Sequence, residues 1–351
     1  MYIKTRVFIA FLVLCFVVFS VFGCSPENEP DSSDGPAEDF KIAFLLPGSI
    51  DDGSWNSSAY EAVMSLEKEG YSVNYVDQVA TTDIEELFRN YASRGYKLII
   101  GHGYQFGEPA LRVAPDFPES YFFSSGVCPV DKSILDEVKN VGFIDTKEYE
   151  SCYISGYLAA AVSKTGTIGF IAGMGIPVQI ANTAAFILGA HDMNENIEVL
   201  SVISGDFNDA ALGREIALAM IDGNADVICN TADSTGFAAI EAAAEKGVKV
   251  IGYGADQSAR FPGTWLTAGL SDAKEYLLQQ VERIKQGTFG GEWRPGYSEG
   301  IVLNTPLNEE LIPADVIEKV ELKMKEIRDG TFVVQQINEV DKIPYFKVET
   351  R

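Results

Sequence analysis

A short segment near residue 50 concentrates side chains that can bind a small molecule. Residues 47–56 read Pro-Gly-Ser-Ile-Asp-Asp-Gly-Ser-Trp-Asn. They follow an apolar run at 41–46, which predicts a buried strand, and they precede a helix predicted at 55–69. In open α/β sheets, ligands bind at the carboxyl ends of the strands. The segment therefore predicts one wall of a binding site.

The side chains of this loop suit a planar ligand. The indole of Trp55 could stack on a ring, while Asn56 and Asp52 hydrogen-bond the edge of that ring. Stacking geometry adds about 0.5–1.5 kcal/mol to the burial of the ring. An alternative is that Trp55 packs beneath the helix and the aspartate only caps its first turn. The loop alone leaves both interpretations open.

A second glycine-rich loop, residues 101–108, follows another predicted strand. Its Glu108 begins a predicted helix, where the helix dipole favours an anion. Glu108 could accept hydrogen bonds from N–H groups of a ligand, or it could simply face solvent. The glycines match neither the dinucleotide-binding nor the P-loop spacing, so a nucleotide-hydrolysing site of that type is not expected.

The second half of the chain offers four further loops, each following a predicted strand, at 173–177, 205–209, 230–236 and 254–257. Phe207 lies between polar residues and could face Trp55 across a cleft. Asp256 has no obvious capping function before Pro262, so a ligand contact and a turn are equally good interpretations. These loops predict the opposite wall of the site.

Alternating strand and helix patterns run from residue 40 onward and restart after residue 164. Such a βαβαβα order indicates parallel sheets covered by helices on both faces. We expect a first lobe from residues 40–164 plus 258–300, and a second from 165–257 plus 301–351. The strands are predicted at 41–46, 72–76, 97–101, 120–124, 138–143, 167–172, 198–203, 226–230, 248–253, 265–269 and 298–303, with one or two more in the last twenty residues.

The first 39 residues predict an export signal and a tether. A basic start is followed by an apolar run at 7–22 that is too short to span a membrane comfortably, and then by Gly23-Cys24. This ending resembles a bacterial lipobox, so residues 1–23 would be removed and Cys24 would carry the lipid; an ordinary signal peptide with a chance cysteine is the alternative. Residues 24–39, rich in Pro, Ser, Asp and Glu, would be a disordered tether. The protein is therefore expected to be extracytoplasmic and lipid-anchored to the cell membrane.

Composition excludes several classes of function. The net charge of −24 disfavours a nucleic-acid partner. Two histidines, His102 and His191, and no CxxC motif leave little material for a metal site or a catalytic triad. Cys128, Cys152 and Cys229 are expected to be buried free thiols. We expect no cofactor, no metal, no enzymatic activity and a monomer.

Three segments carry a family resemblance: DDGSWNSSAYEA at 51–62, GDFND with the helix after it at 205–228, and VIGYGADQ at 250–257 with WLTAGL at 265–270. They resemble the basic-membrane-protein, or PnrA-like, lipoproteins from about residue 40 to residue 307. The resemblance implies an α/β chain with the type I periplasmic-binding-protein fold, in which a hinge joins two doubly wound parallel-sheet lobes. It also implies capture of a purine nucleoside or purine base, which is delivered to an ABC permease and its ATPase.

The resemblance further implies roles for single residues. Trp55 and Phe207 would sandwich the ring, Asn56 and Glu108 would read its edge, and Asp256 would accept from ribose hydroxyls. Two positions depart from the family: Ser271 replaces a lysine, and Asp233 opens a segment that is usually Gly-Gly-Thr-Gly. Both lie on the sugar side, so nucleoside and free base both remain open.

Other functions remain open beside purine transport. The ligand could be another planar molecule such as riboflavin, or the protein could be a surface sensor or antigen that does not transport. A nucleoside-cleaving enzyme is a third class, but it would need a placed general base or a metal-held water.

Overall fold

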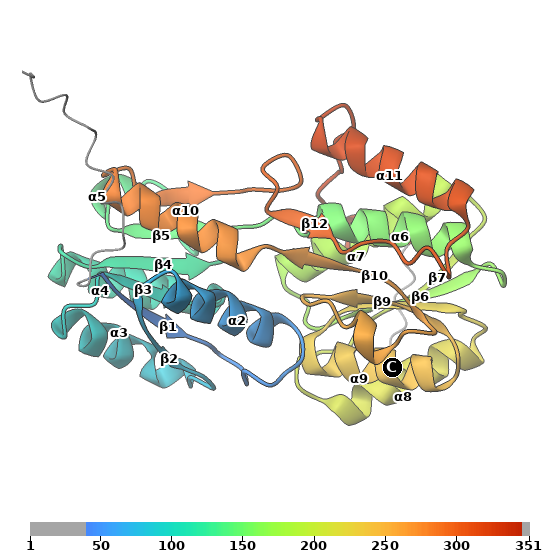
Figure 1. The fold of residues 1–351 in the computed structure, drawn as a ribbon, viewed down its shortest axis with the longest axis horizontal. Helices are drawn as coiled ribbons and strands as arrows, with labels where there is room; N and C mark the ends of the chain where they lie inside the picture. Colours follow the sequence, from blue (N-terminus) through green and yellow to red (C-terminus); the bar gives the residue numbers. More distant parts are fainter. Residues whose placement is uncertain (1–39, 346–351) are drawn as a thin grey trace, which may run out of the picture. The chain divides into compact units, whose positions relative to one another are not determined.

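The structure, a computed structural model, describes residues 40–345 of the 351-residue chain, so the predicted signal peptide, Cys24 and the tether lie outside the described part. The described residues form two six-stranded sheets with helices on both faces of each (Figure 1). The predicted pair of doubly wound α/β lobes is thus confirmed. Within this part of the chain, every helix is too short or too polar to cross a membrane.

The first sheet has the strand order β11-β5-β4-β3-β1-β2, and all its strands are parallel. Its strands are β1 (Lys41–Leu45), β2 (Ser72–Val76), β3 (Leu98–Gly101), β4 (Tyr121–Ser125), β5 (Val141–Ile144) and β11 (Gly291–Trp293). The helices of this lobe are α2 (Trp55–Lys68), α3 (Ile84–Ser93), α4 (Gly107–Val113), the short α5 (Ile134–Glu137) and α10 (Ala273–Lys285).

Alternate residues of β1 are buried on opposite faces of this sheet. Ile42 and Phe44 pack with α2 and α10, whereas Ala43 and Leu45 pack with α3 and α4. A strand covered on both sides reads as a continuous apolar run, which is why its existence was predictable from sequence.

The second sheet has the order β12-β10-β9-β8-β6-β7 and is parallel except for β12, which runs antiparallel to β10. Its strands are β6 (Thr167–Ala172), β7 (Glu198–Ile203), β8 (Val227–Thr231), β9 (Lys249–Tyr253), β10 (Trp265–Ser271) and β12 (Val302–Asn304). Helices α6 (Tyr149–Val162), α7 (Pro177–Met193) and α11 (Ala314–Arg328) cover one face, and α8 (Ala210–Asp222) and α9 (Asp233–Glu245) cover the other.

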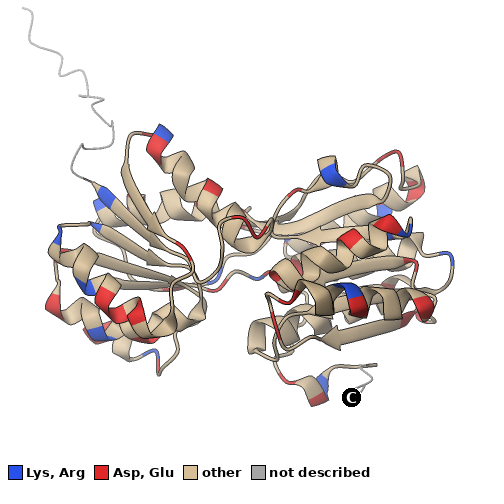
Figure 2. Ribbon diagram, turned by 90° about the horizontal axis from the view of Figure 1, so that it is seen from below, with Lys and Arg blue, Asp and Glu red and all other residues tan. Residues whose placement is uncertain are grey.

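Three segments connect the lobes: residues 145–148, residue 272 and residues 294–301. They are joined to one another by backbone hydrogen bonds, from Lys147 N to Pro295 O (2.8 Å) and from Asp272 N to Ile301 O (2.7 Å). Acidic residues lie in both lobes and along the connecting segments (Figure 2). These three segments correspond to the predicted hinge.

The predicted lobe limits need two corrections. Strand β10 was expected in the first lobe, within 258–300, but it pairs with β9 in the second sheet. Helix α6 was expected in the first lobe, within 40–164, but it packs on α7, β10 and β12 of the second. The periodicity of a segment predicts that a strand or helix exists. The strands and helices that it packs against depend on where the chain crosses between the lobes.

Smaller differences concern the ends of the chain. The edge strand β11 was not predicted, because three residues carry too little pattern. The final segment up to Tyr345 forms no strand among the described residues. Cys128, Cys152 and Cys229 are buried free thiols, as expected.

Helices α6 and α7 approach each other closely because each has a glycine at the crossing. A Cβ added at Gly156 would overlap the carbonyl oxygen of Phe186, and a Cβ added at Gly189 would overlap that of Tyr153. Backbone thus packs on backbone at the centre of the second lobe.

We expect Gly189→Ala to lower the free energy of unfolding by about 1–3 kcal/mol, because the new methyl group overpacks this contact. Urea denaturation measures the change. Gly263→Ala is the matched control, since no atom lies within 4 Å of a Cβ there, and its effect should stay within about 0.5 kcal/mol. Equal stability of the two variants would contradict the close crossing.

Candidate functional site

The loop between β1 and α2 is organised around the carboxylate of Asp52, which is 8% exposed. Oδ1 accepts from the backbone N–H groups of Ser54 and Ser57 (both 2.9 Å). Oδ2 accepts from the backbone N–H of Asn56 (2.9 Å) and from its side-chain amide (2.8 Å). These donors include the free N–H groups of the first turn of α2, where a carboxylate is favoured. Asp52, predicted as a ligand contact, therefore has a structural role that uses both of its oxygens.

Asn56 is also engaged within the loop. Its Oδ1 accepts from Gly48 N at 3.3 Å, and a Cβ added at Gly48 would lie 2.6 Å from the Asn56 Nδ2. The side chain is almost fully buried. An amide has two donor hydrogens and two acceptor lone pairs, so one N–H and one lone pair remain for a ligand.

Trp55 is half-buried and stacks on His102, with ring centroids 3.5 Å apart and planes inclined by 24°. The imidazole is 3% exposed, and its Nδ1 lies 3.2 Å from Ser125 Oγ. Burial lowers the pKa of His102 to about 3, because the charged form would lose its hydration. A neutral ring thus supports one face of the indole.

The same loop touches the second lobe directly. Ser54 Oγ donates to the carbonyl of Tyr253 (3.1 Å), and the Gln257 side-chain amide donates to the carbonyl of Gly53. A Cβ added at Gly254 would lie 3.0 Å from Ser54 Oγ and 3.1 Å from Trp55 N. The loop therefore connects the two lobes and places Trp55 beside the loop that follows β9.

The wall from the second lobe is built from the loops after β6, β7 and β8. The ring of Phe207 lies directly on Gly173, leaving no space for a Cβ there. The Phe207 carbonyl accepts from Thr235 N (3.0 Å) at the start of α9. These contacts join the Phe207 loop to the loop that carries Asp233. Among the described residues, no ring contact joins Trp55 and Phe207.

Glu148, in the connecting segment 145–148, lies at the hinge side of these loops. Its Oε2 accepts from the Tyr253 hydroxyl (2.6 Å), and its Oε1 lies 3.2 Å from Thr146 Oγ1 and 3.5 Å from Ser271 Oγ. Burial raises the pKa of the Glu148 carboxyl, while the hydrogen bond from Tyr253 opposes the rise. Ser271, predicted on the sugar side, thus contacts a carboxylate that the sequence reasoning did not select.

Asp233 is the first residue of α9, is half-buried, and has a φ of 44°, in the left-handed region that non-glycine residues rarely adopt. Burial, followed by the charges of Asp52 and Glu148, raises the pKa of the Asp233 carboxyl well above its usual range. The predicted site residue Asp233 therefore lies among other carboxylates near the inter-lobe contact.

Two predicted contacts lie at exposed positions. The Glu108 carboxylate is 3.4 Å from Arg112 on the surface of α4. Asp256 is exposed and accepts from Ser258 N at 2.9 Å, so it has the turn function that its sequence did not reveal. The structure supplies a structural role for each of these carboxylates.

Sequence reasoning missed Glu148, Tyr253 and Asn182. Glu148 follows strand β5, so the rule that selected the other loops would have selected it too. Asn182 is a polar residue in helix α7, whose sequence is mostly apolar, and its side chain is 0% exposed. An amide within a mostly apolar helix was the available signal.

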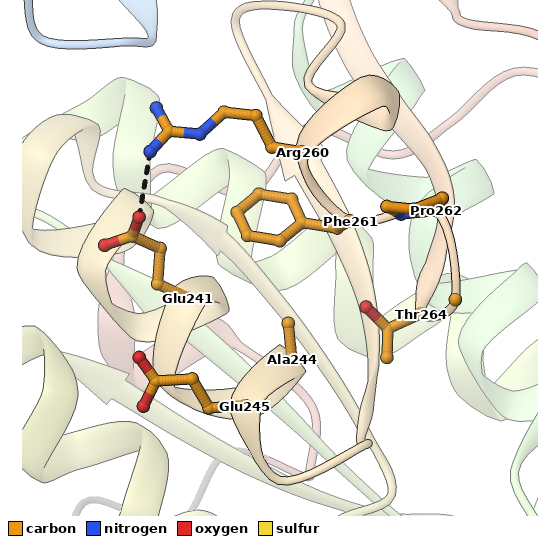
Figure 3. A pocket seen from close by; sticks show the side chains of 8 residues that line it. Glu241, Ala244, Glu245, Arg260, Phe261, Pro262 and Thr264 are labelled. Carbon is orange, nitrogen blue, oxygen red and sulfur yellow. Dashed lines mark hydrogen bonds and ion pairs between the residues drawn. The ribbon is translucent and has the colours of Figure 1, made fainter.

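A surface hollow of about 350 Å³ lies elsewhere on the second lobe, between α9 and residues 260–264 (Figure 3). Its charged groups already have partners within the protein. Arg260 is 3.0 Å from Glu241 and covers the ring of Phe237, while Glu245 pairs with Arg214 at 2.7 Å. We therefore place the candidate ligand site at the loops between the lobes.

Burial of neutral His102 predicts a loss of stability in acid. Its folded pKa of about 3 is below the unfolded value of about 6.5, so the unfolded chain binds the proton first. The stabilisation is complete above about pH 6.5 and decreases as the pH falls toward 3. From pH 7 to pH 5 the His102 contribution should fall by about 2 kcal/mol. Urea denaturation of wild type and His102→Gln at both pH values isolates the contribution of His102 to the free energy of unfolding. If the stability of the two proteins changed equally with pH, His102 would not be the residue responsible.

The contact at Gly254 predicts an effect on lobe closure. Gly254→Ala should separate the lobes, because its methyl group would press on the loop that carries Ser54 and Trp55. Gly247→Ala is a matched control, since both glycines have positive φ (78° and 74°) but no atom lies within 4 Å of a Cβ at 247. Small-angle X-ray scattering should give a larger radius of gyration for Gly254→Ala alone. Identical radii would show that this contact does not hold the lobes.

Known proteins share this architecture. Residues 40–336 match the family described as ABC transporter substrate-binding protein PnrA-like. A solute-binding protein of an ABC transporter system from Conexibacter woesei is 25% identical, with a TM-score of 0.73 over 86% of this chain and 100% of the other. The match in fold is thus accompanied by a match over nearly all of the described sequence.

Similar relatives include basic membrane protein B of Borreliella burgdorferi, 32% identical over 82% of this chain and 87% of the relative. A purine-binding protein of Brucella abortus is 27% identical over 84% of this chain and 82% of its own. The nucleoside-binding protein BmpA of Lactococcus lactis is 27% identical over 80% and 82%, respectively. The chain therefore belongs to the PnrA-like family of extracytoplasmic ABC transporter substrate-binding proteins, which bind a small molecule for a permease and are not enzymes.

Proposed function

We propose that this protein is a lipoprotein, anchored through Cys24, that binds a purine base or purine nucleoside between its lobes and delivers it to an ABC permease. The stacking platform formed by Trp55 on His102 carries the proposal. A purine is a planar, polar ring that gains from stacking on one face and from hydrogen bonds at its edge. The purine-binding and nucleoside-binding names of two relatives agree with this ligand class.

In the proposed complex the ring lies on the indole of Trp55 and is covered by Phe207 from the second lobe. The remaining N–H and lone pair of Asn56 read its edge. Asp233 and Ser271 face the substituent that points away from Trp55. Glu108 and Asp256 have no assigned contact, because both are exposed and already engaged.

Ligand binding would be coupled to closure of the lobes. The β1–α2 loop provides the Trp55 platform and also the contact to Tyr253, so a bound ring and the closed contact stabilise each other. Hinge closure of this kind is the usual response of two-lobed binding proteins. The protein would act as a monomer, since the site needs only the two lobes of one chain.

Isothermal titration calorimetry of the purified protein tests the ligand class. Inosine, guanosine, adenosine, adenine, xanthine and riboflavin form the panel. We expect saturable heat from at least one purine, and no heat from any of the purines would overturn the proposal. Heat from riboflavin alone would replace the purine with a flavin.

Trp55→Ala should weaken binding of that purine by roughly tenfold to a hundredfold, because stacking of a base on an aromatic side chain is worth about 1–3 kcal/mol. Trp55→Phe is the conservative control and should retain most of the affinity. The ligand should also quench the fluorescence of wild type but not that of Trp55→Phe. Unchanged affinity of Trp55→Ala would remove Trp55 from the site.

A further inference from the structure

A polar cluster at the hinge side of the site, defined by Glu148, Asp233 and Asn182, is not neutralised by the protein. Glu148 comes from the segment that connects the lobes, Asp233 from the start of α9 and Asn182 from the second turn of α7. Asn182 lies close enough to Glu148, and Glu148 close enough to Asp233, for each to affect the pKa of the neighbouring carboxyl. Asp233 and Asn182 have no hydrogen-bond partner among the described residues, and Glu148 has hydrogen-bond donors but no cationic partner.

The Asp233 carboxylate accepts no hydrogen bond from any residue that the structure describes. The charges acting on it most strongly are those of Asp52 and Glu148, which repel it. Its backbone is held in the left-handed region, with φ at 44°. An unpaired carboxylate among like charges is unfavourable, so it would gain from a partner that brings positive charge.

Glu148 receives only neutral donors. The hydroxyls of Tyr253 and Thr146 hydrogen-bond to it, and Ser271 Oγ lies at 3.5 Å. The charge that acts on it most strongly is that of Asp145, another acid. Of the basic side chains close to this segment, Arg294 is paired with Asp145 at 2.7 Å. Lys147, within the segment, acts on Glu150 and Glu299 instead.

Asn182 supplies an independent sign that a ligand group is missing. Its side chain is 0% exposed, and neither its Nδ2 nor its Oδ1 has a hydrogen-bond partner among the described residues. The amide faces Glu148 closely enough to lower the pKa of that carboxyl, but not in hydrogen-bond geometry. By contrast, the Oε1 of its neighbour Gln179 accepts hydrogen bonds from Thr231 Oγ1 (2.6 Å) and Gly173 N (3.3 Å). Buried amides are normally paired, so an amide with both polar atoms unpaired marks a place for a polar group of the ligand.

A metal ion does not fit this cluster. Across residues 40–345, no group of three or more His, Cys, Asp or Glu side chains is arranged to hold one. The cluster instead combines two separated acceptors with an amide that both donates and accepts. Such a set suits an organic ammonium group, which has three donors.

We propose that the ligand carries a protonated amino group, attached to the part of the molecule beyond its planar ring, and that Glu148, Asp233 and Asn182 bind this group. The inference rests on the proposed function, because it assigns the second half of the same site. The substrate class is then an aminated purine nucleoside or a similar cation with a planar ring, in preference to the neutral nucleoside.

The test compares adenosine with 5′-amino-5′-deoxyadenosine and 3′-amino-3′-deoxyadenosine by calorimetry at neutral pH and low salt. At least one amino nucleoside should bind roughly tenfold tighter than adenosine, because hydrogen bonds to charged groups are the strong ones. Equal or weaker binding of both would overturn the inference and leave the purine site intact. If neither adenosine nor either amine bound, this inference would be overturned, and the proposed function would stand or fall with the other purines of the calorimetry panel.

Variants show whether the cluster causes the preference. Asp233→Asn and Glu148→Gln should reduce the tenfold advantage to roughly threefold or less. Asp206→Asn, at an exposed carboxylate in a nearby loop, should keep it. An advantage that survives both cluster variants would assign the attraction to the general negative charge of the protein and overturn the proposal.

Ser271→Lys provides the converse test. Because Ser271 Oγ lies 3.5 Å from Glu148, a lysine there can place its own ammonium in the cluster. This variant should bind the amino nucleosides less tightly relative to adenosine than wild type does. Circular dichroism and thermal melting without ligand confirm folding, and Asp233→Asn should melt at a higher temperature than wild type because a repelled charge is removed. If folded Ser271→Lys preferred the amino nucleosides over adenosine as strongly as wild type does, the ammonium group would not be bound beside Ser271.

Discussion

The hydrogen bonds to Asp52 are the interaction on which the site depends. One carboxylate collects donors from the turn before α2 and from the first turn of that helix. This arrangement fixes the direction in which Trp55 leaves the backbone and holds Asn56 in place. It also sets the position of Ser54, which bonds to the second lobe. A residue that does not need to touch the ligand thus positions those that do.

The two halves of the site differ in chemistry. On the side of the first lobe, an indole rests on a neutral imidazole, and the Asp52 carboxylate beside it is fully engaged by hydrogen bonds. On the hinge side, the Asp233 carboxylate and the buried Asn182 amide lack hydrogen-bond partners. The first half suits a ring and the second suits a charged or donor-rich substituent. A binding protein needs both, because shape selects a class of ligands and unpaired polar groups reject members that lack the matching substituent.

Much of the fold could be predicted from sequence, because its strands are buried on both faces and its helices have clear periodicity. The loops at the carboxyl ends of the strands were also predictable, and Trp55 and Asn56 lie where that rule placed them. The lobe to which β10 and α6 belong was not predictable, since it depends on where the chain crosses from one lobe to the other. Glu148 and Asn182 were missed because a hinge residue and a buried amide are recognisable only from their neighbours. Asp256 and Glu108 had no recognisable partner in the sequence, because the turn contact of Asp256 and the ion pair of Glu108 are visible only in the three-dimensional structure.

The order in which the two sheets are completed has a consequence for biosynthesis. The edge strand β11 of the first sheet and the edge strand β12 of the second both come from residues 291–304. Neither lobe can acquire its full set of strands until most of the polypeptide has been made. Such long-range pairing is slow, because the entropy of closing the loop is lost before the stabilising contacts form. Both sheets therefore stay incomplete until late in synthesis, when the edge strands from residues 291–304 become available to pair.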